Sequence, residues 1–179
     1  MARAIGLLPL GDFPETVARR LASDLGLALS RETLVRPALP LPDACRDAAR
    51  GQFRSLQLLD AVADADVDTG RPELHRALAL TTADLCLESE RHFEFVFGVA
   101  DPLRGLALVS THRLAPDAAK SLPPRLLVEA VHELGHTFGL AHCKDPRCVM
   151  FFSVTLADSD RKGYLPCARC RPLPESSWS

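Results

Sequence analysis

Apolar and polar residues follow two different patterns at the start of the chain. Residues 4–10 (AIGLLPL) form an uninterrupted apolar run, which is typical of a buried strand. In the following segment, ETVARRLASDLG, apolar residues recur at helical spacing: Val17, Leu21 and Leu25. Gly26 is suited to end this helix. The chain is therefore expected to begin with a strand and a helix.

The next part of the chain has a less regular pattern. Residues 27–36 are expected to form a second strand, and the proline-punctuated segment 37–42 (PALPLP) a loop. A helix is then expected from about residue 43 to residue 65, because three apolar residues fall on one side of it: Phe53, Leu56 and Leu59.

Three further strands are expected before residue 112. They are 78–88 (LALTTADLCLE), 92–100 (HFEFVFGVA) and 105–111 (GLALVST), with a turn between the last two. Alternation in the second of them puts Phe93, Phe95 and Phe97 on one face. Strands that alternate with helices predict an α/β fold with a mixed, mainly parallel sheet that can carry one antiparallel strand.

The segment 121–143 (SLPPRLLVEAVHELGHTFGLAHC) has the pattern of a helix with two different sides. Pro123 and Pro124 suit its first turn. Apolar residues form one stripe (Leu127, Val131, Leu134 and Phe138), and polar residues form another (Glu129, His132, Glu133 and His136). We therefore expect a core side and a chemical side.

Three histidines of this segment have the spacing of a metal site. His132 and His136 lie four residues apart, so they project from one face of the helix and can share an ion. Gly139 can adopt the positive φ that ends the helix, which would bring His142 round as a third ligand. Three neutral imidazoles leave a coordination position open for water, as in catalytic zinc sites. Glu133 is the candidate to take the proton of that water.

Four of the six cysteines follow in the pattern C-x4-C-x18-C-x2-C: Cys143, Cys148, Cys167 and Cys170. Two short-spaced pairs of thiolates can close a tetrahedral shell, which is typical of structural zinc. A redox Cys-x-x-Cys motif would need a preceding strand and a following helix, which this Pro-rich end of the chain does not suggest. Cys45 and Cys86 stand in apolar surroundings and are expected to be small buried residues.

The pattern changes after Leu140, where the sequence becomes Cys-rich and irregular. We expect residues 1–139 to form an α/β sheet subdomain that ends in the metal-binding helix. Residues 140–179 are expected to form a small subdomain held by zinc. Together they would make one catalytic domain.

Composition narrows the possible partners. The 179 residues are 47% hydrophobic and 25% charged, with a formal net charge of -2, as in a globular protein without a broad basic face. Nucleic acid is therefore not expected as a partner. No apolar stretch is long enough to span a membrane, and the N-terminal residues lack the pattern of a signal peptide. A cytoplasmic monomer is expected.

The residues of both metal sites resemble the archaemetzincins, a branch of the metzincin metallopeptidases. The resemblance rests on HELGHTFGLAHC and the spaced residues after it. It implies a metzincin-like fold with an antiparallel edge strand, an active-site helix and a zinc-stapled Cys-rich subdomain. It assigns roles by motif position: His132, His136 and His142 to the catalytic zinc, Glu133 to the general base, Cys143, Cys148, Cys167 and Cys170 to a second zinc, and Met150 to a turn beneath the catalytic metal.

The same resemblance makes Phe95, Val96, Phe97 and Gly98 the edge strand that pairs with an extended substrate. Core packing of the phenylalanines is the simpler interpretation and is compatible with that role. Some metzincins have a tyrosine two residues after the turn methionine, where this chain has Phe152. Tyr164 is then a candidate to support the oxyanion, although packing on the Cys-rich subdomain is the simpler expectation. The remaining histidines are expected to be solvated or capping residues: His75, His92 and His112.

The sequence thus predicts a zinc-dependent metallopeptidase with two zinc ions per chain, one catalytic and one structural. Water on the catalytic zinc, activated by Glu133, would attack a peptide carbonyl. The alternative is a zinc-stabilised module that binds peptides or proteins with little or no catalysis. Glu133 favours the enzyme, because a binding module has no need of a base. Whether the enzyme trims ends or cuts internally stays open.

Overall fold

The central element of the fold is a five-stranded sheet of strand order β2-β1-β5-β8-β7. The computed structural model describes residues 4–67, 74–88, 94–115 and 121–170. The strands are β1 (Ala4–Pro9), β2 (Thr33–Val35), β5 (Leu74–Thr81), β8 (Leu106–Ser110) and β7 (Gly98–Asp101). The first four are parallel to one another, and β7 lies antiparallel to β8 at the edge. This arrangement confirms the predicted mainly parallel sheet with an antiparallel edge strand.

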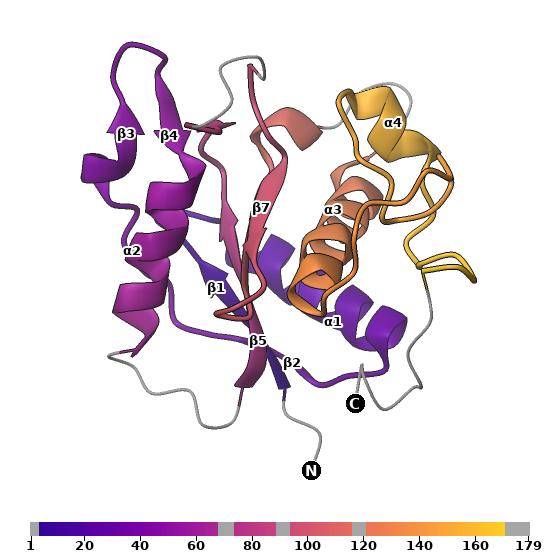
Figure 1. The fold of residues 1–179 in the computed structure, drawn as a ribbon. Helices are drawn as coiled ribbons and strands as arrows, with labels where there is room; N and C mark the ends of the chain where they lie inside the picture. The colour runs from indigo at the N-terminus through magenta and orange to yellow at the C-terminus, as the bar shows by residue number, and fades with distance from the viewer. Residues whose placement is uncertain (1–3, 68–73, 89–93, 116–120, 171–179) are drawn as a thin grey trace.

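A small second sheet has the strand order β3-β4-β6. It consists of β3 (Arg46–Asp47), β4 (Gln52–Arg54) and β6 (Leu85–Cys86). Figure 1 shows β3 and β4 projecting beyond the end of α2 (Ser55–Val67).

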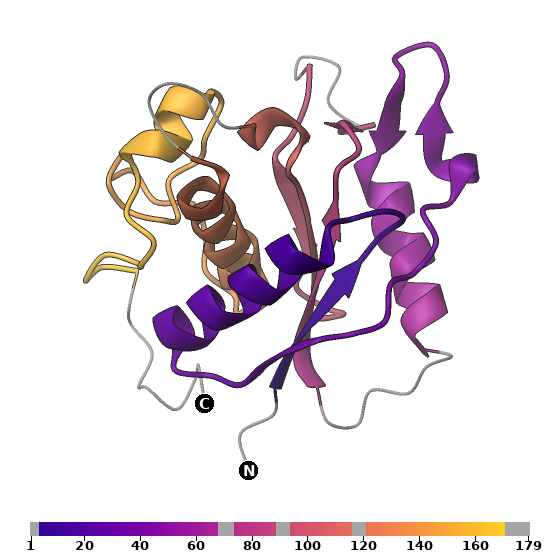
Figure 2. The same ribbon diagram turned by 180° about the vertical axis from the view of Figure 1, so that it is seen from behind.

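Helices cover both faces of the larger sheet (Figures 1 and 2). α1 (Glu15–Leu29) and α3 (Leu122–Thr137) pack on one face, and α2 packs on the other. The remaining helices are short: α4 (Leu156–Arg161) beside α3, and the 3-10 helices η1 (Asp43–Cys45) and η2 (His112–Leu114). No helix in the described residues is long and apolar enough to cross a membrane.

Two apolar clusters hold these layers together. In β1, Ile5 and Leu7 join the cluster under α1 and α3, while Leu8 and the following Leu10 join the cluster under α2. All four are buried, and each apolar side chain of this size stabilises the fold by about 1.5–3 kcal/mol. Because successive side chains of a strand point to opposite faces, a strand in the middle of the sheet must be apolar throughout. This is why the first segment of the chain shows an unbroken apolar run.

The end of the first helix differs from the prediction. α1 continues past Gly26 to Leu29, and Ser30 adopts the left-handed conformation with φ 51°. The carbonyl of Gly26 accepts a hydrogen bond from the Arg31 N–H at 3.1 Å, which closes the last turn. The strand expected over 27–36 is therefore reduced to Thr33–Val35.

The expected helix over 43–65 was wrong in its first half. The chain instead forms η1 and the β3–β4 hairpin, with Gly51 at φ 68° in the turn, and the helix begins only at Ser55. Phe53 lies in β4 opposite Leu85, so its burial is against a strand and not along a helix face. Pairing with a distant strand overrides the local helical spacing.

Two predicted strands are also shorter than expected. The strand over 78–88 is interrupted after Thr81 and resumes as β6. The strand over 92–100 begins only at Gly98, and Phe93 lies outside the described residues. Phe95 and Phe97 nevertheless pack edge to face, with ring centroids 5.2 Å apart, and Phe97 is buried. Cys45 and Cys86 are buried as expected.

Two buried ion pairs join α3 to the segment around α4. Arg125, fully buried in α3, makes two hydrogen bonds of 2.8 Å to the carboxylate of Asp160. One turn further along α3, Glu129 lies 3.0 Å from the ammonium of Lys162, and the two side chains are 2% and 0% exposed. Removing one member of such a pair leaves a charge buried without its partner. We therefore expect these pairs to fix α4 against α3.

Lys162→Met should lower the free energy of unfolding by about 3–5 kcal/mol, because Glu129 would keep its charge in the interior without a cation. The double variant Lys162→Met, Glu129→Leu removes both charges and should recover most of that loss. Urea unfolding followed by circular dichroism measures both. A double variant as unstable as the single one would contradict the proposed origin of the loss.

Candidate metal centre and cleft

The three histidines of the predicted motif come together at the end of α3. His132 and His136 project from the last turns of the helix, which ends where Gly139 adopts φ 87°. The Leu140 N–H donates to the carbonyl of Gly135 at 3.0 Å, so the chain turns back and brings His142 to the same place. The ligand atoms of His132, His136 and His142 all lie within 4.8 Å of one another. The predicted turn at Gly139 is present.

Hydrogen bonds fix the orientation of two of these rings. Nδ1 of His132 lies 2.7 Å from the carbonyl oxygen of Val149, and Nδ1 of His136 lies 2.8 Å from that of Leu140. A carbonyl only accepts hydrogen bonds, so both Nδ1 atoms carry the proton and both Nε2 atoms present a lone pair. Burial lowers the pKa of all three imidazoles below the usual value, which keeps the rings neutral at pH 7.

The distance between the two Nε2 atoms fits a shared metal ion. They lie 3.2 Å apart, and two lone pairs that face each other at this distance cannot form a hydrogen bond. On a tetrahedral zinc with ligands at about 2.0 Å, two nitrogen atoms are about 3.3 Å apart. The donor set and its spacing therefore fit zinc.

Glu133 is buried beside this group and is 6% exposed. Burial, together with the negative charge of Glu129, raises the pKa of its carboxyl group to about 8, although the positive charge of Lys162 opposes the shift. A carboxyl group that titrates near neutral pH can both take and return a proton. A cation held by the histidines would favour the charged form and lower this pKa.

A cleft opens above Glu133. One wall comes from the residues before and at the start of β7, the other from the segment after Met150, and α3 forms the floor. The wall residues are Phe95, Val96, Phe97 and Gly98 on one side and Phe152, Ser153 and Val154 on the other; the floor residues are Glu129, His132 and Glu133. The predicted substrate-strand residues therefore line the same cleft as the predicted base.

Met150 packs against the last turns of α3 at Gly135. It is fully buried, and a Cβ atom built at Gly135 would lie only 2.5 Å from its Sδ atom. Any side chain at position 135 would therefore push the methionine away from the helix. The sequence analysis did not single out Gly135, although a glycine in the middle of a helix is a signal of close approach.

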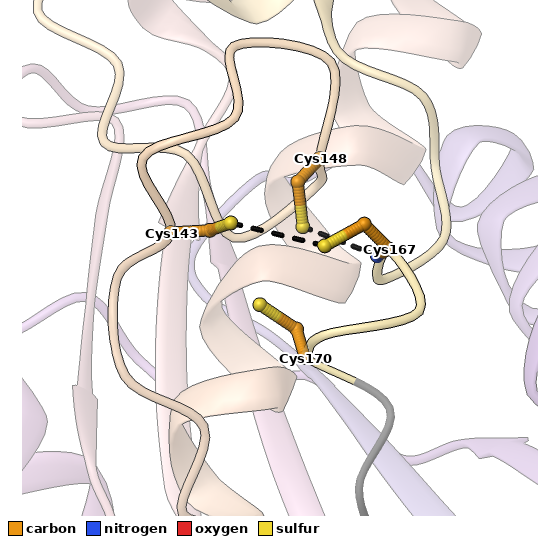
Figure 3. A group of neighbouring side chains, drawn as sticks. All are labelled: Cys143, Cys148, Cys167 and Cys170. Carbon is orange, nitrogen blue, oxygen red and sulfur yellow. Dashed lines mark hydrogen bonds between the residues drawn. The ribbon is translucent and has the colours of Figure 1, made fainter.

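The four cysteines form a second group, two from the 143–148 segment and two from the 167–170 segment (Figure 3). Their sulfur atoms point toward one another and lie within 4.8 Å, and those of Cys143 and Cys167 are 3.8 Å apart. Two sulfur atoms on a tetrahedral zinc at about 2.3 Å are also about 3.8 Å apart. All four are free cysteines. This group therefore fits a closed thiolate shell.

Backbone N–H groups point at several of these sulfur atoms. Asp145 donates to Sγ of Cys143 at 3.4 Å, and Cys167 donates to Sγ of Cys148 at 3.3 Å. The N–H groups of Cys170 and Arg169 contribute to lowering the pKa of the Cys167 thiol to about 6, whereas burial raises the pKa of the Cys148 and Cys170 thiols. Such donors favour thiolates, which are the form that binds metal.

Two other sequence candidates, Tyr164 and His112, are not among the described residues that line the cleft. Tyr164 is 50% exposed. Phe152, at the position where some metzincins have a tyrosine, packs beside His142, with the two ring centroids 4.9 Å apart. His112 is exposed, whereas His92 and the side chain of His75 lie outside the described structure.

Three contributors to the site were not foreseen: Glu129, Lys162 and Ser153. The hydroxyl of Ser153 lies 3.5 Å from the Glu129 carboxylate, and Lys162 also donates to the carbonyl of Phe151 at 3.3 Å. The ion pair thus reaches both the floor and one wall of the cleft. Glu129 was placed on the polar side of the helix, but nothing in the sequence indicates that a lysine 33 residues later would meet it.

Comparison with known proteins identifies the family. The model of peptidase family M54 matches residues 43–173. The archaemetzincin of Pyrococcus furiosus is 34% identical over 98% of this chain and 94% of its own length. That of Natronomonas pharaonis is 32% identical over 93% of this chain and 96% of its own.

Solved structures agree with this result. A zinc-dependent peptidase from Methanocorpusculum labreanum has a TM-score of 0.83 at 27% identity, covering 98% of this chain and 100% of that one. The archaemetzincin of Archaeoglobus fulgidus, solved in complex with malonate, has a TM-score of 0.79 at 31% identity, covering 93% of this chain and 97% of that one. The chain belongs to peptidase family M54, the archaemetzincins.

Proposed function

We propose that this peptidase holds its catalytic zinc on His132, His136 and His142 and uses Glu133 as its general base. The observation that carries the proposal is the pair of unprotonated Nε2 atoms 3.2 Å apart, with Glu133 lining the same cleft as His132. Neither Nε2 atom carries a proton, so the two cannot hydrogen-bond to each other. A cation that accepts both lone pairs is the partner that their chemistry favours.

The mechanism follows from what these side chains can do. His132, His136 and His142 would hold the zinc, which when bound would supply Lewis acidity for activating water and polarising a peptide carbonyl. The carboxylate of Glu133 takes the proton of the attacking water and returns it to the leaving amine. The carbonyl groups of Val149 and Leu140 hold the histidine rings in the orientation this requires.

The proposed substrate is a peptide or protein that lies along the edge strand. Phe95, Val96, Phe97 and Gly98 line the cleft at the free edge of the sheet, where an extended chain can add as a further strand. The Val96 N–H already donates to the carbonyl of Leu85 at 3.1 Å. Because the Val96 N–H already has this partner, the substrate is proposed to pair with backbone groups of the neighbouring residues.

A second, structural zinc is proposed at Cys143, Cys148, Cys167 and Cys170. Two observations support this site. The distance between the sulfur atoms of Cys143 and Cys167 matches that of two ligands on a tetrahedral zinc, and backbone N–H groups donate to two of the sulfur atoms. On this proposal, residues 140–179 act as a zinc-held subdomain, and Met150 forms the turn beneath the catalytic metal.

The setting of the enzyme is proposed on chemical grounds. A site of four reduced thiolates suits a reducing compartment such as the cytoplasm. The net charge of -2 supports a protein without a nucleic-acid partner. We also propose that the chain works as a monomer, because all the proposed ligands come from one chain.

Glu133→Gln should reduce the rate of peptide hydrolysis at least about a hundredfold, because the amide keeps the shape of the side chain but cannot take a proton. Zinc content should stay that of the parent protein. Cleavage of a fluorogenic peptide library, with elemental analysis of the same sample, measures both.

Glu15→Gln is the matched control, because it makes the same chemical change at an exposed residue of α1 that does not line the cleft. It should leave the rate unchanged. Full activity of a zinc-loaded Glu133→Gln variant would remove this residue from the mechanism. A parent protein that binds peptides and cleaves none of them would favour the binding alternative.

Protein purified under reducing conditions should contain two zinc ions, and a phenanthroline-type chelator should remove one of them first. The proposed catalytic zinc has three neutral ligands and an open position, whereas four anionic thiolates enclose the other. Brief chelation should therefore abolish hydrolysis with little change in far-UV circular dichroism, and added zinc should restore it.

Two variants separate the sites. His142→Ala should lose one zinc and keep the fold, whereas Cys148→Ser should lose the other and become less stable, because a closed thiolate shell couples metal binding to folding. Simultaneous loss of both ions under mild chelation, together with unfolding, would contradict the division into a catalytic and a structural site.

A further inference from the structure

Gly98, the first residue of β7, leaves a space that the side chain of Glu133 occupies. A Cβ atom built at Gly98 would lie 2.7 Å from Cγ and 2.9 Å from Oε1 of Glu133. It would also lie 2.5 Å from the carbonyl oxygen of Leu108 on the neighbouring strand. Contacts this short do not occur for real Cβ atoms, so something must shift if a side chain is added.

The strand side of this contact is fixed. Ser110 donates its N–H to the carbonyl of Phe97 at 2.8 Å, and Val96 donates to the carbonyl of Leu85 at 3.1 Å. Gly98 itself stands opposite Val109 in the antiparallel ladder. The backbone on both sides of Gly98 is therefore tied to other strands and cannot withdraw from α3 without loss of these bonds.

The helix side is fixed as well. Gly135 lies against the buried Met150, and the imidazole of His132 bonds to the carbonyl of Val149. α3 therefore cannot move away from β7 to make room. The carboxylate of Glu133 lies in a gap whose width is set by two anchored elements.

We propose that Gly98 is a positioning residue for hydrolysis, because the absence of a side chain at this point of the edge strand holds the carboxylate of Glu133 against the strand, facing the cleft. The inference rests on the proposed role of Glu133 as the base. A displacement of about 1 Å in a reacting group can cost about a hundredfold in rate. A single methyl group at position 98 is large enough to displace the Glu133 carboxylate by such a distance.

Room for the Leu108 carbonyl is the competing explanation of this glycine. On that explanation, the cost of a methyl group would not depend on the residue at position 133. The proposal requires the opposite, that the methyl group and the Glu133 side chain compete for one space.

Kinetics give the first test. Gly98→Ala should reduce kcat about a hundredfold while the zinc content equals that of the parent protein. Val99→Ala is the matched control, because Val99 is the next residue of the strand but packs with the cluster under α2. It should lower the melting temperature and leave kcat unchanged. An active Gly98→Ala variant, in a protein that Glu133→Gln inactivates, would overturn the proposal and leave the proposed function intact.

A stability cycle gives the second test and needs no activity. The fall in melting temperature caused by Gly98→Ala should be about half as large, or smaller, when Glu133→Ala has already emptied the space. An equal fall in both backgrounds would overturn the proposal. If Gly98→Ala alone does not fold, a folded double variant would support the proposal, and an unfolded one would overturn it. The cycle still decides the placement of Glu133 if the parent protein proves inactive.

Discussion

The contact between α3 and the strip 148–151 is the constraint on which both candidate metal sites depend. Met150 can pack this closely against α3 only because position 135 of the helix has no side chain. The carbonyl of Val149 orients His132, and the carbonyl of the next residue, Met150, accepts the N–H of Cys143 at 2.8 Å. One strip of backbone therefore orients a histidine of one group and a cysteine of the other. A disturbance at either group has a direct structural route to its neighbour.

Three charged residues on the buried side of α3 have three different environments. Arg125 and Glu129 each meet an opposite charge, supplied by Asp160 and Lys162. Within the described residues Glu133 makes no such ion pair, and its pKa rises to about 8 because it is desolvated next to another carboxylate. Desolvation brings the pKa of Glu133 near neutral pH, as its proposed role in proton transfer requires. The helix thus combines two ion-paired side chains with one buried carboxyl group that has no ion-paired cation in the described residues.

The predictions from sequence succeeded and failed for recognisable reasons. Residues 4–10 and the metal-binding helix have patterns set by their own periodicity, and both appear close to their predicted places. The segment 43–54 was predicted as the start of a helix but forms short strands, because β4 finds its partner in β6, about thirty residues later. The alternation expected over 92–100 likewise gives a strand only where β8 is available for pairing. Periodicity records which side of an element is buried, and it does not record what covers that side.

The sequence by itself determined which histidines and which cysteines come together, since the spacing of histidines on a helix and of cysteines in two pairs is fixed by local geometry. It also determined the turn at Gly139, because a positive φ at a helix end requires little beyond the local chain. Only the tertiary structure decided how the site is held. The gap at Gly98, the approach of Met150 to Gly135 and the pairing of Lys162 with Glu129 each join segments that are distant in sequence. Such contacts depend on the shape of the packed interior, where a single atom too many displaces its neighbours, and no local pattern encodes that shape.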